Sequence, residues 1–285
     1  MKMTAETKQA LLAELLCLAD SEWVLGHWYA KITLNGRSVP DFTSMAAMAQ
    51  DELGHTRALF RFLEQAYELP EYQLEFGRDV DEIHSMQLLD ESPTSWADFV
   101  VTAYLSEYAL LSAMETFAEG NFAPAATMLT KFAEEGYFHR LYIEGWLDAL
   151  DSDERKAASA AFAKRLPLAR AWFSPGSSDD LVAAEGVRTS GWADAEAGFR
   201  AHISDVLESF EVSWSPTLSQ QNWDGRRRRP KGSAMPARLW EYIVPTTPEA
   251  QMARRPLEVS VDDNIDLFDK PKKLDGTEPF FERLG

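Results

Sequence analysis

The stretch QDELGH at residues 50–55 lies within a long run whose apolar residues recur at intervals of three and four. That period is typical of an α-helix with one buried face. Glu52 shares this face with Met45 and Met48, and His55 lies one turn after Glu52 on the same side. A carboxylate on an apolar face is costly to desolvate unless it has a partner. The stretch therefore predicts a buried polar site inside a helical bundle.

Three more helical stretches carry an acidic residue in the same setting. Glu22, Glu107 and Glu135 each lie on an otherwise apolar face, and His139 follows Glu135 by four residues. The order Glu, Glu-x-x-His, Glu, Glu-plus-His is the ligand plan of di-metal carboxylate bundles. Four carboxylates would cancel the charge of two ferrous ions, and imidazole would supply a neutral ligand to each. Glu115 is the alternative to Glu107. The predicted metal ligands are Glu22, Glu52, His55, Glu107, Glu135 and His139.

The last of these helices departs from the plan at one position. The residue three before His139 is Gly136, whereas Glu135 is four before it and is offset by about 40° around the helix. A single π-bulge would restore the usual spacing, and such bulges favour functional sites. Alternatively, this half of the site has drifted and binds metal poorly. On the second helix, Asp51 is expected either to accept a hydrogen bond from a ligand histidine or to be solvated.

Up to about residue 215 the pattern is helical, and no stretch alternates with a period of two. The segment at 70–92 is polar and irregular. The sequence predicts an all-α fold, a ferritin-like four-helix bundle with additional helices. The expected helices are Thr4–Leu34, Asp41–Leu69, Pro93–Ala118, Pro124–Leu150, Ser152–Trp172, Asp179–Arg188 and Trp192–Ser213.

From Pro216 onward the composition changes. Proline is dense here, which forbids long helices, and four consecutive arginines stand at 226–229. One short strand is expected at 257–261. We divide the chain into a helical di-iron domain at 1–215 and an extended Pro/Arg-rich C-terminal tail at 216–285. The tail either wraps the bundle or a partner subunit, or is partly disordered.

The bulk composition excludes several classes of function. The chain has 285 residues with 28 basic and 46 acidic side chains, a net charge of −18, which argues against nucleic-acid binding. The acidic surface is either simply solvated or a docking face for a basic partner. A single cysteine, Cys17, excludes an internal disulfide and favours a reducing compartment. With no signal peptide and no run long enough to span a bilayer, we expect a cytoplasmic protein without membrane contact.

At these motifs the sequence resembles the phenylacetic acid catabolism family, the ferritin-like subunits of the phenylacetyl-CoA epoxidase complex, over roughly residues 5–215. QDELGH at 50–55 is similar to the second-helix motif of the catalytic subunit, and DSE at 20–22 to its first-helix ligand segment. The acidic ligand of its third helix falls on Glu107. EEGYFHR at 134–140 is closer to the non-catalytic sister subunit, as is GWLDAL at 145–150. Because this chain keeps ligands that the sister lacks, it is nearer the catalytic type.

The resemblance implies a di-iron oxygenase. Two iron ions would activate O₂ with electrons from a separate reductase, and oxygen would be inserted into the aromatic ring of an acyl-CoA thioester. A homodimer, or a hetero-oligomer with a related helical subunit, is expected. Two alternatives stay open. One is a non-catalytic structural subunit, which the altered spacing on the fourth helix favours; the other is a ferroxidase or iron-handling bundle, which needs the same ligands.

Overall fold

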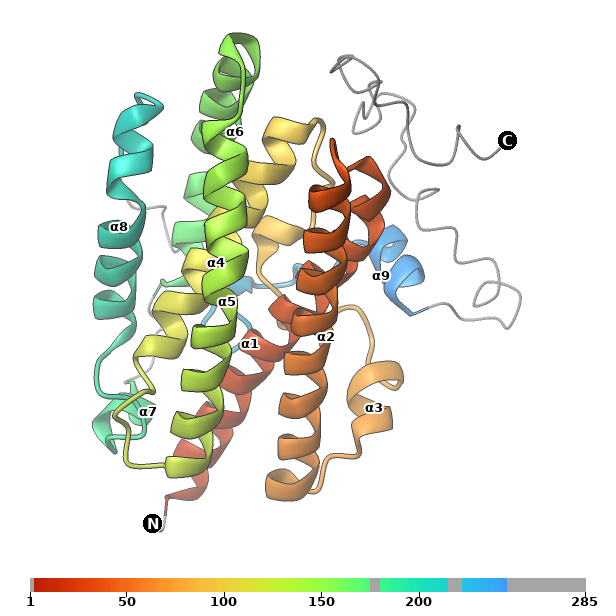
Figure 1. Cartoon of the computed structure of the whole chain (residues 1–285). Coiled ribbons are helices and arrows are strands. Elements are labelled where there is room, and N and C mark those ends of the chain that lie inside the picture. Colours follow the sequence, from red (N-terminus) through yellow and green to blue (C-terminus); the bar gives the residue numbers. More distant parts are fainter. Residues whose placement is uncertain (1–2, 175–179, 215–221, 245–285) are drawn as a thin grey trace.

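The computed structural model describes residues 3–174, 180–214 and 222–244. Four long helices form the bundle: α1 (Ala5–Ile32), α2 (Val39–Tyr67), α4 (Trp96–Glu115) and α5 (Ala123–Asp148) (Figure 1). Helix α1 contacts α2 and α4, and α5 contacts α4 and α2, so the four helices enclose a common interior. The predicted all-α bundle is confirmed.

Polar residues before the helices fix where they begin. The side chains of Thr4, Ser38 and Ser95 each accept a hydrogen bond from a backbone N–H three residues later. Ser95 therefore starts α4 at Trp96, slightly later than the predicted start at Pro93. A short 3₁₀ helix, η1 (Thr33–Asn35), joins α1 to α2.

Further helices surround this bundle. Helices α6 (Ser152–Trp172) and α8 (Trp192–Ser209) contact α4, and the short α7 (Leu181–Ala184) contacts α1 (Figure 1). Helix α7 occupies only part of the helix predicted at 179–188. Helix α3 (Glu71–Phe76) lies against α2 in the segment expected to be irregular. Only Leu74 of this helix is buried, so its sequence shows no helical period of apolar residues from which it could be predicted. Within the described ranges, no helix has both the length and the apolar character needed to cross a bilayer.

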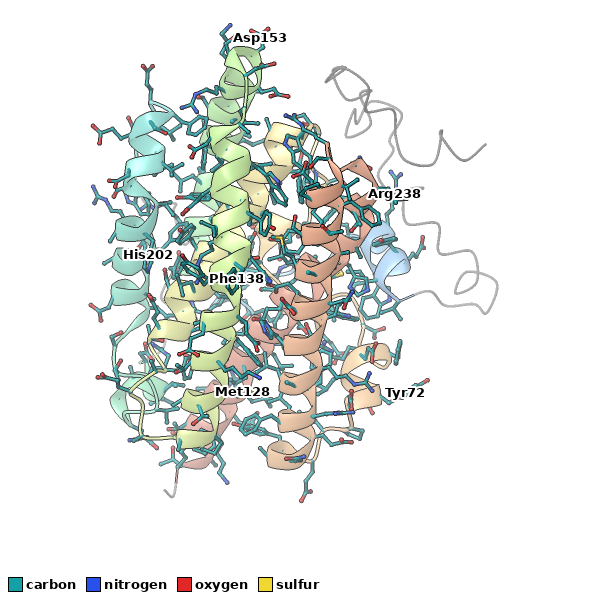
Figure 2. All side chains as sticks on the ribbon, in the orientation of Figure 1. Tyr72, Met128, Phe138, Asp153, His202 and Arg238 are labelled. Atoms are coloured by element: carbon teal, nitrogen blue, oxygen red, sulfur yellow. The ribbon has the colours of Figure 1, made fainter. Side chains whose placement is uncertain are left out.

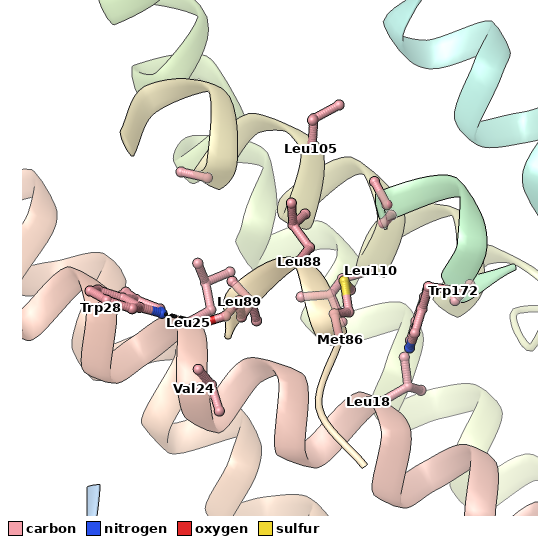
Figure 3. Packing of buried hydrophobic residues seen from close by; sticks show 14 of the residues in the cluster. Leu18, Val24, Leu25, Trp28, Met86, Leu88, Leu89, Leu105, Leu110 and Trp172 are labelled. Atoms are coloured by element: carbon pink, nitrogen blue, oxygen red, sulfur yellow. Dashed lines mark hydrogen bonds between the residues drawn. The ribbon is translucent and has the colours of Figure 1, made fainter. Parts of the chain in front are cut away.

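The segment before α4 is anchored in the core rather than exposed. It contains a 3₁₀ turn, η2 (Gln87–Leu89), which contacts both α1 and α4. Met86, Leu88 and Leu89 are completely buried (Figure 3). The Trp28 indole N–H donates to the Leu89 carbonyl oxygen at 3.0 Å, so this segment fixes the side of α1 that faces α4.

Helix α1 is the central element of the fold. Every residue from 13 to 29 is buried, which means that neighbours cover this helix on all sides. Part of that cover comes from the C-terminal segment. A hairpin of β1 (Trp223–Asp224) and β2 (Arg229–Pro230) precedes α9 (Ala237–Ile243). The Cys17 thiol on α1 donates to the Arg226 carbonyl oxygen at 3.3 Å, which places the hairpin against α1.

The arginine run in this hairpin is folded into the protein. Arg228 is buried, and its guanidinium donates to the carbonyl oxygens of Trp172 at 2.8 Å and Ser174 at 3.2 Å. Arg229 is buried and pairs with Asp90. These contacts join the hairpin to the end of α6 and to the segment before α4. The predicted domain boundary at 215/216 and the predicted strand at 257–261 lie outside the described residues.

A buried lysine lies beneath α9. Lys31 is 1% exposed, and its ammonium group has no hydrogen-bond partner among the described residues. The Nζ atom lies 4.4 Å from the centre of the Trp28 ring and 5.2 Å from that of Tyr242, so aromatic faces provide its main attraction. Burial, together with the charge of Arg238, lowers the pKa of Lys31 from 10.5 to about 7.

We expect Lys31→Met to stabilise the protein by about 5 kcal/mol at pH 6, because it removes a charge that folding must desolvate and each unit of the lowered pKa corresponds to about 1.4 kcal/mol. The folded pKa lies below the unfolded one, so the charge destabilises the fold fully below pH 7, and the effect disappears as the pH rises towards 10.5. Urea unfolding at pH 6 and pH 9 measures the difference. The exposed Lys156 is the control: Lys156→Met should give no such pH-dependent gain. An equal gain at both pH values would contradict the buried charge.

Candidate metal centre

The bundle helices direct five titratable side chains towards one another. Helix α1 contributes Glu22, α2 contributes Glu52 and His55, α4 contributes Glu107 and α5 contributes His139, and all five are buried. Their ligand atoms form two groups, Glu22–Glu52–His55 and Glu52–Glu107–His139, and within each group they lie within 4.8 Å of one another. Because Glu52 belongs to both groups, the arrangement could hold two cations that share one carboxylate.

A glycine on α1 brings the first two helices together at this level. Gly26 lies one turn after Glu22, and a Cβ atom at Gly26 would be 3.0 Å from the Cβ of Glu52 and 3.0 Å from Leu53 Cγ. Such a contact is tighter than side chains normally tolerate. The missing side chain therefore allows α1 and α2 to approach closely where their carboxylates face each other.

The two imidazoles are oriented in the same way. His139 Nδ1 lies 3.1 Å from Glu107 Oε1 and 3.2 Å from Glu52 Oε1, and His55 Nδ1 lies 3.6 Å from Glu22 Oε1. Both Nε2 atoms face the rim of the site. Each meets a more exposed carboxylate there: Asp51 Oδ2 is 3.2 Å from His139 Nε2, and Glu135 Oε2 is 2.8 Å from His55 Nε2. Carboxylates in this position fix the orientation of metal-binding imidazoles.

The interior of the site holds polar atoms that lack partners. Within the described part of the chain, Glu22 Oε2, Glu52 Oε2 and His55 Nδ1 are buried without a hydrogen bond. They surround a cavity of about 10 Å³, the space of a single water or ion. Buried polar atoms in natural proteins almost always have partners. A divalent cation would satisfy all three, and oxygen and imidazole donors together suit iron, so the residues present fit a di-metal centre.

Without cations, protons balance the buried charge. Burial, followed by repulsion from Glu107, raises the pKa of Glu52 to about 8. Burial alone would lower the pKa of His55, but the negative charge of Glu22, 3.6 Å from His55 Nδ1, outweighs burial and raises it to about 9. The pKa of His139 rises to about 12, because the negative charge of Glu107 outweighs burial. The protons held by Glu52, His55 and His139 thus supply the positive charge that metal ions would otherwise bring.

These pKa values predict that metal affinity increases with pH. Metal ions bind the deprotonated ligands, so at pH 6 they must displace protons from Glu52, His55 and His139, whose pKa values are about 8, 9 and 12. Between pH 6 and 8 we expect the apparent affinity for cobalt(II) to rise by about tenfold per pH unit for each proton released. Competition with a chromophoric chelator measures it. An affinity that does not change over this range would show that cobalt binds elsewhere.

Glu135 lies outside both groups. Helix α5 is α-helical at every residue, so the π-bulge considered from the sequence does not form. Without it, the Glu135 side chain is 40% exposed and contacts Lys131 Nζ at 3.3 Å as well as His55. The structure thus places Glu135 on the outer side of His55, in the position that Asp51 has on His139. Whether it binds metal directly stays a prediction.

Gly136 lies where the fourth helix faces the cavity. A Cβ atom there would be 3.6 Å from Glu107 Oε2 and 2.8 Å from Arg140 Nη1. Gly136 and Arg140 both line the cavity, together with Glu22, Glu52 and Glu107. In this chain a guanidinium therefore lies where the bundle plan has a fourth inward carboxylate.

Two residues of the site were not among the predicted ligands. The Tyr29 hydroxyl donates to Glu107 Oε1 at 2.7 Å, and Tyr29 is completely buried. Its position seven residues after Glu22, on the same helical face, was the available signal. Arg140 gave none, because an arginine beside a ligand is most often solvated. The alternative ligand Glu115 lies at the surface, paired with His202 at 3.0 Å.

Comparison with known proteins agrees with this geometry. The model of one protein family, described as phenylacetic acid catabolic protein, matches residues 1–236. The chain belongs to this family. The match includes all four bundle helices and the hairpin at 222–230. No curated protein matches the sequence. Membership associates the chain with phenylacetic acid catabolism, and its two carboxylate–imidazole groups are compatible with a di-iron site.

Proposed function

We propose that this chain is the iron-binding subunit of a multicomponent oxygenase that inserts oxygen into the aromatic ring of an acyl-CoA thioester. The observation that carries the proposal is the pair of ligand groups sharing Glu52 in the interior of the bundle. Family membership supports the substrate class, because phenylacetic acid is an aromatic acid. O₂ as co-substrate and a separate reductase complete the proposed system.

Five residues would hold two iron ions: Glu22, Glu52, His55, Glu107 and His139. When bound, the iron pair would supply the redox chemistry that activates O₂. The chain's own residues keep the site dry and ordered. Leu110, Leu111, Met114 and Phe132 line the cavity and are buried, so they exclude water.

Hydrogen bonds from neighbouring residues orient the proposed ligands. Tyr29 donates to Glu107 and holds one of its oxygens in place. Asp51 and Glu135 hold the two imidazoles by their outer nitrogens, and the His55 ring also stacks on Phe132 at 4.1 Å. A ligand set held in this way changes little when metal binds.

An exposed apolar surface on α5 supports the proposed association with a related helical subunit. Tyr137, Phe138, Leu141 and Tyr142 are all exposed, and their spacing places them along one outward side of the helix. Phe138 projects from α5 in Figure 2. Large aromatic side chains gathered on a surface are typical of protein–protein contacts.

A second candidate is the non-catalytic structural subunit. Gly136 and Arg140 favour it, because none of the described residues of α5 places a carboxylate in the cavity. A structural subunit would use the buried charges to hold the helices together and would not need bound iron.

An isotope experiment tests the proposal. The full chain would be loaded anaerobically with ferrous iron, then mixed with phenylacetyl-CoA, a chemical reductant and ¹⁸O₂, and the thioester analysed by mass spectrometry. We expect one labelled oxygen atom in the product. Glu52→Ala should give none. Iron oxidation that continues beyond the bound ions without labelled product would indicate an iron-handling bundle. A chain that binds no iron would indicate the structural subunit.

A further inference from the structure

Along its described inner side, α5 places no carboxylate in the candidate metal centre. Gly136 is buried and lines the same cavity as Glu52 and Glu107. A side chain at Gly136 would point into that cavity, since its Cβ would lie 3.6 Å from Glu107 Oε2. The nearest atom to this point is Arg140 Nη1, at 2.8 Å. The Arg140 guanidinium therefore fills the point where a side chain of residue 136 would begin, and it places a positively charged donor beside Glu107.

The Arg140 guanidinium is held towards this position by other contacts. Its Nη2 donates to the Ala133 carbonyl oxygen at 2.9 Å, and its Cζ lies 5.9 Å from the centre of the Tyr108 ring. Both contacts leave Nη1 beside Gly136. A guanidinium presents a planar fork of N–H groups that matches the two oxygens of a carboxylate.

The charges of the loaded site would not balance without another anion. The inward carboxylates are Glu22, Glu52 and Glu107. Two divalent cations exceed their charge by one, and Arg140 adds a further positive charge at the cavity wall. Glu135 and Asp51 lie at the more exposed rim, where solvent screens them. Excess positive charge in a dry interior is costly unless a counter-ion is present.

We propose that the Arg140 guanidinium beside Gly136, together with the metal ions, binds a small monoanion of the carboxylate class. The inference rests on the proposed function, because the metal ions supply part of the attraction. The external carboxylate would take the place of the fourth inward glutamate of the bundle plan. The ligand must be small, because the cavity that Leu110, Leu111 and Met114 line has a free volume of only about 10 Å³.

The test uses the full chain loaded with cobalt(II), whose visible absorption reports changes in its ligands, and formate as the probe. Metal content is measured first. We expect formate to change the cobalt spectrum of the wild type in a saturable way. Arg140→Gln should weaken formate binding by about tenfold or more, the usual loss for a charged hydrogen bond, with metal content unchanged. The surface arginine Arg57, paired with Glu71, is the control, and Arg57→Gln should bind formate like the wild type.

A second variant supplies the missing group from the helix. Gly136→Glu should keep the metal content and abolish the formate response, because its own carboxylate would pair with Arg140 in place of formate. Its close neighbour Nη1 is the end of a flexible side chain that can move. Two results would overturn the anion site alone. One is a metal-loaded wild type whose cobalt spectrum does not change with formate, and the other is an Arg140→Gln variant that binds formate as well as the wild type. A chain that binds no metal would overturn both the anion site and the proposed function.

Discussion

The Glu52→Ala variant should lose both metal ions at once, because Glu52 is the only residue common to the two ligand groups. Removing a ligand found in one group alone would leave the other group intact. Loss of even an indirect partner of a metal ligand typically costs 10- to 100-fold in affinity. We therefore expect apparent affinity at both positions to fall by about 100-fold or more. Metal analysis after desalting and competition titration with cobalt(II) measure the loss.

The fold should survive this substitution. Burial raises the pKa of Glu52 to about 8, so without metal the carboxylate ion is unfavourable in the folded state. Its removal takes away no stabilising charge, and the far-ultraviolet circular dichroism should be retained. Glu115, a surface glutamate on α4 paired with His202, is the control. If Glu115→Ala lost as much metal as Glu52→Ala, the site would not be the one described.

The Asp98→Ala variant should lose about 3–5 kcal/mol of stability, the usual cost of leaving a buried charge without its partner. Asp98 is 5% exposed and Arg165 is completely buried. Their side chains form two hydrogen bonds that join α4 to α6, and the Asp98 carboxylate also accepts from the Thr94 backbone N–H at 2.8 Å. Burial opposes ionisation, but the hydrogen bond and charge of Arg165 hold the pKa of Asp98 below its usual value. Urea unfolding at pH 7 measures the loss.

Two further variants isolate the buried pair. The exposed pair of Asp153 and Lys156 is the matched control, and Asp153→Ala should cost less than about 1 kcal/mol. Adding Arg165→Met to Asp98→Ala should recover part of the lost stability, because no unpaired guanidinium then stays buried. Equal losses for Asp98→Ala and Asp153→Ala would mean that the buried pair does not hold α6 against α4.

The helices were predictable because the physics that forms them is local. The helical period of three and four residues, together with Pro40, Pro70, Gly36 and Gly120, predicted the bundle helices within a few residues. Glu22, Glu52 and Glu107 were found because an acid on an apolar face stands out in the sequence. All three are buried and face the same cavity.

The parts that sequence could not predict depend on distant contacts. Four consecutive arginines are usually solvated. Arg228 is nevertheless buried, because the carbonyl oxygens of Trp172 and Ser174 accept hydrogen bonds from its guanidinium. Those oxygens become available only where α6 ends. Likewise, the orientation of Glu135 depends on whether α5 bulges, and a bulge is decided by the packing of the whole helix. The role of Gly136 depends on Arg140, whose direction only the folded chain defines.

The central claim is that this bundle holds two metal ions sharing Glu52. Iron content per chain, measured after anaerobic loading with ferrous iron and desalting, tests it most directly. The two ligand groups predict about two irons per chain in the wild type and almost none in Glu52→Ala. A wild-type chain that retains no iron, or a Glu52→Ala variant that retains both ions, would contradict the account.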